Sequence, residues 1–333
     1  MSKNTSKSIL VTGVTGYVGG RLVPRLLQAN HKIRVLVRGR AERLEGRPWK
    51  NHVEIVNGDV LEPVTLAAAM RDIDSAYYLV RRMSGRGEIG NRNFRAATNF
   101  AKLASEAGVG NIIFLGGIGD VGNEPSEFLQ LRPRTGDALR QFNVPVTEFQ
   151  AGMIVGCGSL TFEMIRNLTE RLPIMVAPHW VYTKTQPIAV NDVLNYLVSA
   201  LQTPDSQEKI IEIGGPDVLT YADMMMTYAH IRDLRRMIIR VPVLTPRLSS
   251  YWVHWITPVS SSAVIPFIEG LRSELILRDQ LARNLFPDIK PIDFETALRG
   301  ALERTEKAEI ETLWSDAIAQ KACEYSKASL STN

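Results

Sequence analysis

Three glycines near the beginning of the chain, Gly13, Gly16 and Gly19, follow a short apolar run at residues 8–12. The run has the residue types of a buried strand, and helical periodicity begins at Tyr17. In such a strand–turn–helix unit the first glycine permits a tight turn, the second leaves room for phosphates, and the third lets the helix pack closely on the strand. Main-chain N–H groups and the positive end of the helix then face the anion. The spacing therefore predicts a site for the paired phosphates of a dinucleotide.

Short apolar runs alternate with helix-length segments over the first 150 residues. Most runs are apolar at successive positions, which is typical of strands covered on both faces. Strands are expected at residues 8–12, 32–37, 52–56, 75–80, 111–115 and 145–149, and helices at 17–30, 63–71, 91–107 and near 133–142. This alternation implies parallel strands joined by right-handed crossovers. The predicted fold class is therefore α/β, a doubly wound parallel sheet of the Rossmann type, and this context favours the phosphate site over a chance glycine loop.

The length of 333 residues is compatible with about two domains. We expect a nucleotide-binding domain at residues 1–155 and a smaller α+β region at 156–333 that forms a substrate site or lid and is partly interwoven with the first domain. In a doubly wound sheet, ligands lie at the carboxyl ends of the strands where the strand order reverses. A substrate is accordingly expected between residues 81–83, 116–118 and 156–162.

Composition and charge exclude several classes of protein. Lys and Arg number 39 against 35 for Asp and Glu, and this formal charge of +4 is too small for strong steering of nucleic acid. Cys157 and Cys323 are too few for a disulfide framework and lack the spacing of a metal site. The polar residues 1–8 contain no leader, and no segment is long and apolar enough to span a membrane. We therefore predict a cytoplasmic protein without a metal, a nucleic-acid partner or a transmembrane segment.

Further motifs resemble those of one enzyme superfamily. The T-G-x-x-G-x-x-G at residues 12–19, "NGDV" at 57–60, "AYYLV" at 76–80 and "NFRAATNF" at 93–100 are similar, in this order, to motifs of the extended and atypical short-chain dehydrogenase/reductase superfamily. "TQPIAVNDVLNYLVSAL" resembles the NmrA-like and YbjT-like NAD(P)-binding branch. The residues expected to bind the cofactor are Thr12, Gly13, Thr15, Gly16, Tyr17, Val18, Gly19, Arg38, Asp59, Val60, Leu79, Val80, Gly116 and Gly117.

The end of the second strand distinguishes the two nicotinamide cofactors. A carboxylate there would bind the ribose 2′-hydroxyl of NAD, whereas a basic residue accommodates the 2′-phosphate of NADP. Arg38 occupies this position, and no carboxylate appears before Glu42. Since a guanidinium can grip a phosphate with two hydrogen bonds, we predict NADP rather than NAD. The alternative is that Arg38 is a solvated surface base; Arg40 and Arg43 are weaker candidates.

The usual catalytic residues of the superfamily are missing from this sequence. Its carbonyl chemistry uses a Tyr four residues before a Lys, together with a Ser, and the chain contains no Tyr-x-x-x-Lys. Gly116 and Gly117 stand where the Ser would be expected, and the catalytic residues stay unassigned. Two functions remain. One is an NADP-dependent oxidoreductase of an apolar or quinone-like small molecule, and the other is a non-catalytic NADP(H)-sensing regulator or complex-assembly subunit.

Three features of the second half have uses beyond nucleotide binding. Residues 247–270 are rich in aromatic and apolar residues and predict a lid over the substrate, a docking face for a membrane surface or a protein, or a simply packed helix. Residues 224–226 are three methionines, which fill a core or an adaptable apolar pocket. Asp192 and the pair Thr220 and Asp223 are predicted to cap helices.

Overall fold

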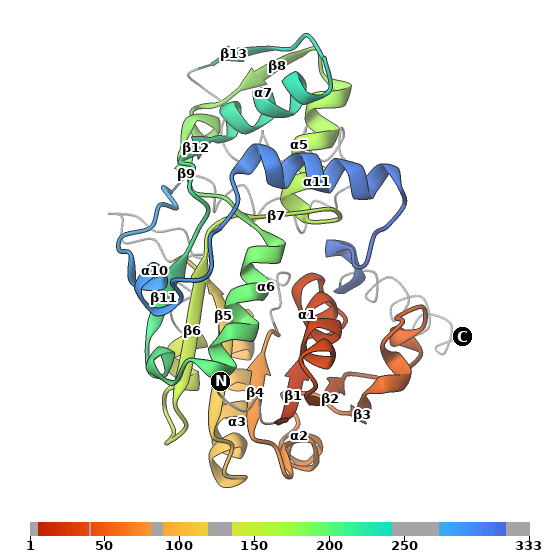
Figure 1. Ribbon diagram of the computed structural model, residues 1–333, viewed down its shortest axis with the longest axis vertical. Coiled ribbons are helices and arrows are strands. Elements are labelled where there is room, and N and C mark those ends of the chain that lie inside the picture. Colours follow the sequence, from red (N-terminus) through yellow and green to blue (C-terminus); the bar gives the residue numbers. More distant parts are fainter. Residues whose placement is uncertain (1–5, 40, 81–88, 119–134, 242–272, 318–333) are drawn as a thin grey trace, which may run out of the picture.

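The computed structural model of the protein describes residues 6–39, 41–80, 89–118, 135–241 and 273–317. Within them seven parallel strands form one sheet in the order β11-β6-β5-β4-β1-β2-β3, and this order reverses between β1 and β4 (Figure 1). The predicted doubly wound parallel sheet is confirmed. Its strands are β1 (Ser8–Thr12), β2 (Lys32–Val37), β3 (Glu54–Asn57), β4 (Ser75–Tyr78), β5 (Asn111–Gly117), β6 (Val146–Ala151) and β11 (Ile210–Ile213).

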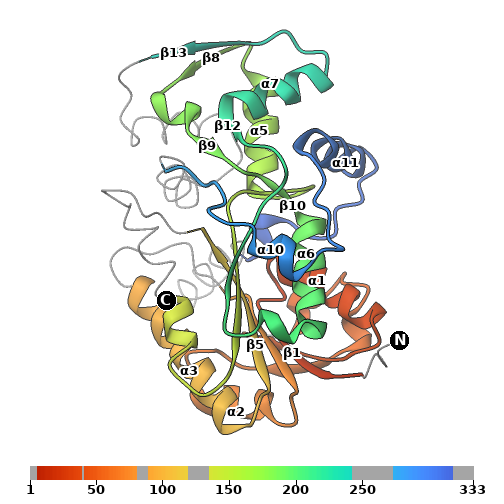
Figure 2. The ribbon, with the colours of Figure 1, turned by 60° about the vertical axis from the view of Figure 1, so that its left-hand side comes forward.

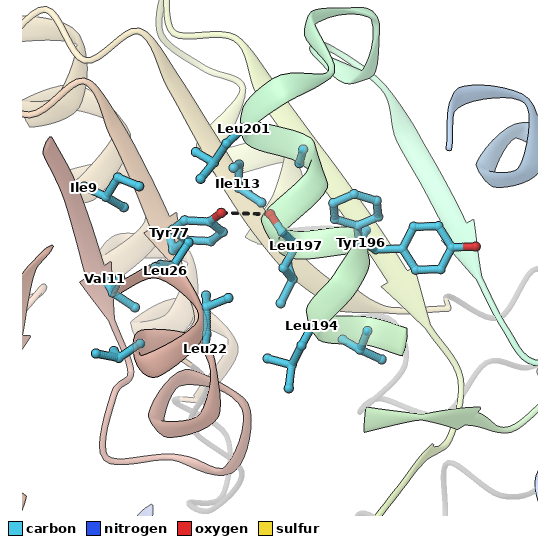
Figure 3. Packing of buried hydrophobic residues seen from close by; sticks show 14 of the residues in the cluster. Ile9, Val11, Leu22, Leu26, Tyr77, Ile113, Leu194, Tyr196, Leu197 and Leu201 are labelled. Atoms are coloured by element: carbon cyan, nitrogen blue, oxygen red, sulfur yellow. Dashed lines mark hydrogen bonds between the residues drawn. The ribbon is translucent and has the colours of Figure 1, made fainter. Parts of the chain in front are cut away.

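Helices cover both faces of this sheet. The helices α1 (Tyr17–Gln28) and α6 (Val190–Ser199) pack on one face, and α2 (Pro63–Met70) and α3 (Ile89–Glu106) pack on the other. Each face has a continuous apolar core, as the successive apolar residues of the strands require. The Tyr77 hydroxyl donates to the Leu197 carbonyl oxygen at 2.8 Å and so joins β4 to α6 inside the first core (Figure 3).

A second lobe lies beyond the carboxyl ends of the strands (Figure 2). It has its own apolar core, built around α5, α7 and α11. Its elements are β7 (Ile154–Val155), α5 (Leu160–Arg171), β8 (Ile174–Ala177), β9 (Lys184–Thr185), β10 (Ile188–Ala189), β12 (Leu219–Thr220), α7 (Tyr221–Ile231), β13 (Met237–Arg240) and α11 (Phe294–Glu306), whereas α10 (Leu281–Leu285) packs on β11 of the sheet. Three two-stranded pairings, β7 with β10, β9 with β12 and β8 with β13, complete this lobe as described.

Several expectations about individual elements need correction. The strand predicted to end at residue 115 continues through Gly117, and the expected helix near 133–142 is helical at 135–139 within the described part. The seventh strand, β11, was not predicted; it comes from the second half of the chain and pairs with β6. The division into residues 1–155 and 156–333 stays a prediction.

The two predicted helix caps have opposite outcomes. Thr220 and Asp223 form the expected capping box at the start of α7. Asp192 does not cap α6, whose N-cap is Ala189. Its carboxylate instead accepts the N–H of Ile292 at 3.0 Å, and burial raises the pKa of the Asp192 carboxyl. Asp192 therefore ties the chain before α11 to α6, a contact that no local pattern could indicate.

Among the residues described, no helix combines the length and the hydrophobicity needed to cross a bilayer. The described residues also contain no cluster of His, Cys, Asp and Glu suited to a metal ion. The segment 247–270 lies outside the described residues, so the three alternatives for it stay predictions.

Candidate functional site

A cavity of about 430 Å³ opens at the carboxyl ends of the strands, where the strand order reverses between β1 and β4. Every residue predicted to bind the cofactor, from Thr12 to Gly117, borders this cavity. Residues of the second lobe line its other end. The structure therefore brings the whole predicted set to one place.

The glycine turn at one wall of the cavity has two glycines that the protein's own packing requires. Gly13 has a φ of +73°, and a Cβ there would lie 2.4 Å from the Leu79 carbonyl oxygen. A Cβ at Gly19 would lie 2.4 Å from the Gly13 carbonyl oxygen. These contacts are the tight turn and the close packing of the helix that the spacing predicts.

Gly16 differs from the other two glycines, because little in the protein prevents a side chain there. Its φ is −88°, and a Cβ would meet only the Gly13 carbonyl oxygen, at 3.2 Å. Gly16 borders the cavity, so a side chain at this position would occupy ligand space. This is the arrangement expected of the glycine that leaves room for the phosphates.

The first turn of α1 faces the same space without a cap. Gly16 is the N-cap residue, no side chain caps the helix, and its first turn has no acidic residue. The first amide N–H groups of a helix have no acceptor within the helix, and the helix dipole makes this end positive. The turn and the helix end therefore fit the two phosphates of a dinucleotide.

Arg38 and Asp59 lie at the end of the cavity formed by β2 and β3. The Arg38 guanidinium is 3.7 Å from the Asp59 carboxylate, and 43% of the Arg38 side chain is exposed. Arg43 also borders the cavity here and donates to the Arg38 carbonyl oxygen. Arg40 lies outside the described residues. The guanidinium groups of Arg38 and Arg43 outnumber the Asp59 carboxylate, so these three side chains together carry a net positive charge.

The opposite end of the cavity consists of segments far apart in the sequence. Gly116 and Gly117 lie at the end of β5, and Thr161 lies near the start of α5. These residues belong to two of the three expected substrate segments; residues 81–83 lie outside the described part. The further lining residues that sequence reasoning missed include Ala151, Gly152, Met153, Ile154, Tyr221, Leu275 and Trp314.

Tyr17 is a poor candidate for a base at this site. Its hydroxyl donates to the Cys157 carbonyl oxygen at 3.2 Å, and burial raises the pKa of the phenol. The Arg21 guanidinium, 4.6 Å from the centre of the ring, opposes this increase without cancelling it. The phenol is therefore neutral at ordinary pH, and the catalytic residues stay unassigned.

A buried arginine connects α1 to the segment that carries Trp314. Arg21 donates to the Thr312 hydroxyl at 2.7 Å, to the Cys157 carbonyl oxygen at 2.8 Å and to the Thr312 carbonyl oxygen at 3.2 Å. Its guanidinium also lies 3.7 Å from the Glu311 carboxylate. The main-chain N–H of Trp314 donates to the Gly158 carbonyl oxygen at 2.9 Å. This bond fixes the chain where Trp314 borders the cavity.

The Arg21→Met variant should therefore lose stability, because its removal leaves buried acceptors without donors. We expect the free energy of unfolding to fall by about 3 kcal/mol, measured by urea denaturation. The matched control is Arg299→Met, which removes an exposed pair with Glu295 and should cost at most about 0.5 kcal/mol. Equal losses in the two variants would contradict a stabilising role for the buried network.

Comparison with protein families identifies the first half of the chain. Residues 13–143 match the family model described as NAD(P)H-binding. This region contains the glycine turn, Arg38, Asp59 and the end of β5. The match therefore covers the part of the cavity that the sequence had predicted to hold the nucleotide.

Individual relatives are distant. The chain is 27% identical over 187 residues to a UDP-glucose 4-epimerase of Mycolicibacterium smegmatis, a match that covers 53% of this chain and 57% of the epimerase. It is 24% identical over 252 residues to a ceramide reductase of Caulobacter vibrioides, covering 73% of this chain and 76% of the reductase. The chain thus spans less than two thirds of the epimerase.

A solved structure shares the fold over nearly the whole chain. The triphenylmethane reductase of Citrobacter sp., complexed with NADP(H), superposes with a TM-score of 0.68 at 18% sequence identity. The alignment covers 88% of this chain and 99% of that one. The fold, including the second lobe, is therefore shared with this reductase.

Proposed function

Because residues 13–143 form an NAD(P)H-binding domain and the fold is that of epimerases and atypical short-chain reductases, we propose that the chain is an NADP(H)-dependent oxidoreductase of an apolar or quinone-like small molecule. One observation carries the proposal. A single cavity extends from Arg38, past Gly16 and the uncapped N-terminus of α1, to a largely apolar end at the second lobe. The nucleotide end and the apolar end are therefore parts of one continuous cavity.

NADPH, when bound, would supply a hydride to an electrophilic carbon of the substrate, and water would supply the proton. The first-turn amides of α1 would hold the diphosphate, and Arg38 would hold the 2′-phosphate. Gly116 and Gly117 leave the cavity wall at the end of β5 without side chains, while Met153 and Leu275 make the wall apolar at the other end. The curated relative named a ceramide reductase supports the reduction of an apolar molecule.

A second function is favoured by the sequence itself. The chain contains no Tyr-x-x-x-Lys motif, which would lower the pKa of a tyrosine. The pKa of Tyr17 is raised, so Tyr17 is not an activated phenol either. A protein that binds NADP(H) and transmits its presence, as a redox sensor or an assembly subunit, requires the nucleotide site without a proton donor. The two functions therefore differ in turnover and agree in binding.

Steady-state oxidation of NADPH against a panel of quinones and enones tests the proposal. We expect sustained consumption of NADPH over many turnovers, with at least one apolar acceptor and faster than with NADH. Tight binding of NADPH without consumption by any acceptor would favour the sensor. Failure to bind either nucleotide would contradict both functions.

A further inference from the structure

The second lobe contains another cavity directly beside the first. It measures about 50 Å³ and lies between α5, β8, the turn at Trp180 and α7. Met153, Thr161 and Tyr221 line both cavities. These three residues therefore form the boundary between the substrate end of the first cavity and the second cavity.

The wall of the second cavity is almost entirely apolar. Its lining residues other than the three shared ones are Met164, Ile165, Leu168, Met175, Val176, Ala177, Pro178, Trp180, Val181 and Met225. None of the described lining residues is charged. A polar or charged ligand would lose its hydration here without compensation, whereas a hydrocarbon group would not.

Methionines give this wall an adaptable shape. Met164, Met175 and Met225 are buried and come from three different elements. A thioether side chain has several rotatable bonds and adjusts to irregular apolar shapes at little cost. The wall can therefore accommodate a flexible chain. Of the three predicted methionines, Met224 fills the core, Met225 lines this cavity, and Met226 is exposed.

The polar atom of Trp180 does not reach this apolar surface. Its Nε1 atom is buried, and no described group accepts a hydrogen bond from it. Its ring packs edge-on against that of Tyr221, with centroids 6.3 Å apart, beside the boundary between the cavities. The cavity therefore offers a ligand the apolar ring of Trp180 and not its N–H group.

We propose that the second cavity binds the hydrocarbon part of an amphiphilic substrate. The reactive end of the same molecule then extends past Thr161 and Tyr221 into the first cavity. The substrate class is thus a carbonyl compound with an alkyl or acyl tail. This assignment rests on the proposed function for the reactive end, whereas binding of the tail is measurable without turnover.

Calorimetric titration with 2-alkanones of increasing chain length tests the tail site. For the protein saturated with NADP⁺, which cannot reduce a ketone, we expect affinity to rise about fourfold for each methylene group that enters the cavity, and then to stop rising. In Ala177→Leu, which fills part of the cavity, the rise should stop at a shorter chain. The matched control is Ile174→Leu, a conservative change at a residue that is 54% exposed and does not line the cavity.

Two further measurements keep the result interpretable. Ala177→Val fills less space and serves if Ala177→Leu does not fold. The matching 1-alkenes should show the same gain in affinity for each methylene group, since the tail site contacts hydrocarbon alone. Affinity independent of chain length, or unchanged in both Ala177 variants, would overturn the proposal. If the unchanged protein bound 2-alkanones as expected but did not bind NADPH, only the proposed function would be overturned.

Discussion

Replacing Gly16 with Asp is expected to abolish dinucleotide binding while leaving the protein folded. Gly16 has an extended backbone, with φ −88° and ψ 176°, at the N-cap of α1, where Asp is among the favoured residues. The new carboxylate would accept hydrogen bonds from the first-turn amides and place negative charge where the phosphates bind. We expect the dissociation constants for NADPH and NADH to rise at least about 100-fold, measured by fluorescence titration, with no loss of thermal stability.

The matched comparison is Gly13→Ala, which adds far less volume. Gly13 has a positive φ, and its added Cβ would lie 2.4 Å from the Leu79 carbonyl oxygen, so this variant should lose both stability and binding. The two variants thus separate a glycine that the fold requires from one that the ligand requires. If Gly16→Asp bound NADPH within about threefold of the unchanged protein, the phosphates would have to lie elsewhere.

The Arg38→Ala variant is expected to lose most of the preference for NADPH over NADH. Hydrogen bonds to a charged group contribute roughly 1.5–3 kcal/mol each, which corresponds to about 10- to 100-fold in affinity. NADH lacks the 2′-phosphate, so its affinity should change by less than about threefold. Fluorescence titration of the unchanged protein and of Arg38→Ala with each nucleotide measures the ratio of the NADPH and NADH affinities directly.

Two variants control for the charge itself. Arg299→Ala removes an exposed positive charge on α11, away from the cavity, and should leave the ratio unchanged. Asp59→Asn removes the carboxylate 3.7 Å from Arg38 and should strengthen NADPH binding about twofold to fivefold. Equal affinity of the unchanged protein for NADPH and NADH would refute the assignment of Arg38 to the 2′-phosphate.

Most of the first half of the fold could be predicted from the sequence. Strands such as residues 8–12 and 32–37 begin and end as predicted, because buried parallel strands are continuous apolar runs bounded by turns. The glycine turn could also be predicted, since its backbone conformation and the close approach of neighbouring main chain leave room only for glycine at some positions. These constraints are local, so each one determines the types of residues that lie close together in the sequence.

The substrate end depended on the tertiary structure. Tyr221, Leu275 and Trp314 meet Gly117 at one cavity from segments at least 39 residues apart, and no periodicity or spacing relates them. The role of Asp192 shows the same limit, because its partner Ile292 is 100 residues away. β11 joins the sheet for a similar reason: its short apolar run becomes a strand only against the edge of β6.

The sequence by itself determined the nucleotide half of this protein: the parallel sheet, the glycine turn and the arginine after the second strand. The tertiary structure alone decided which distant side chains close the other end of the cavity and where the apolar second cavity lies. The physical reason is that turns, caps and strands follow from interactions between near neighbours in the chain. A cavity between two lobes is formed by contacts whose partners only packing selects.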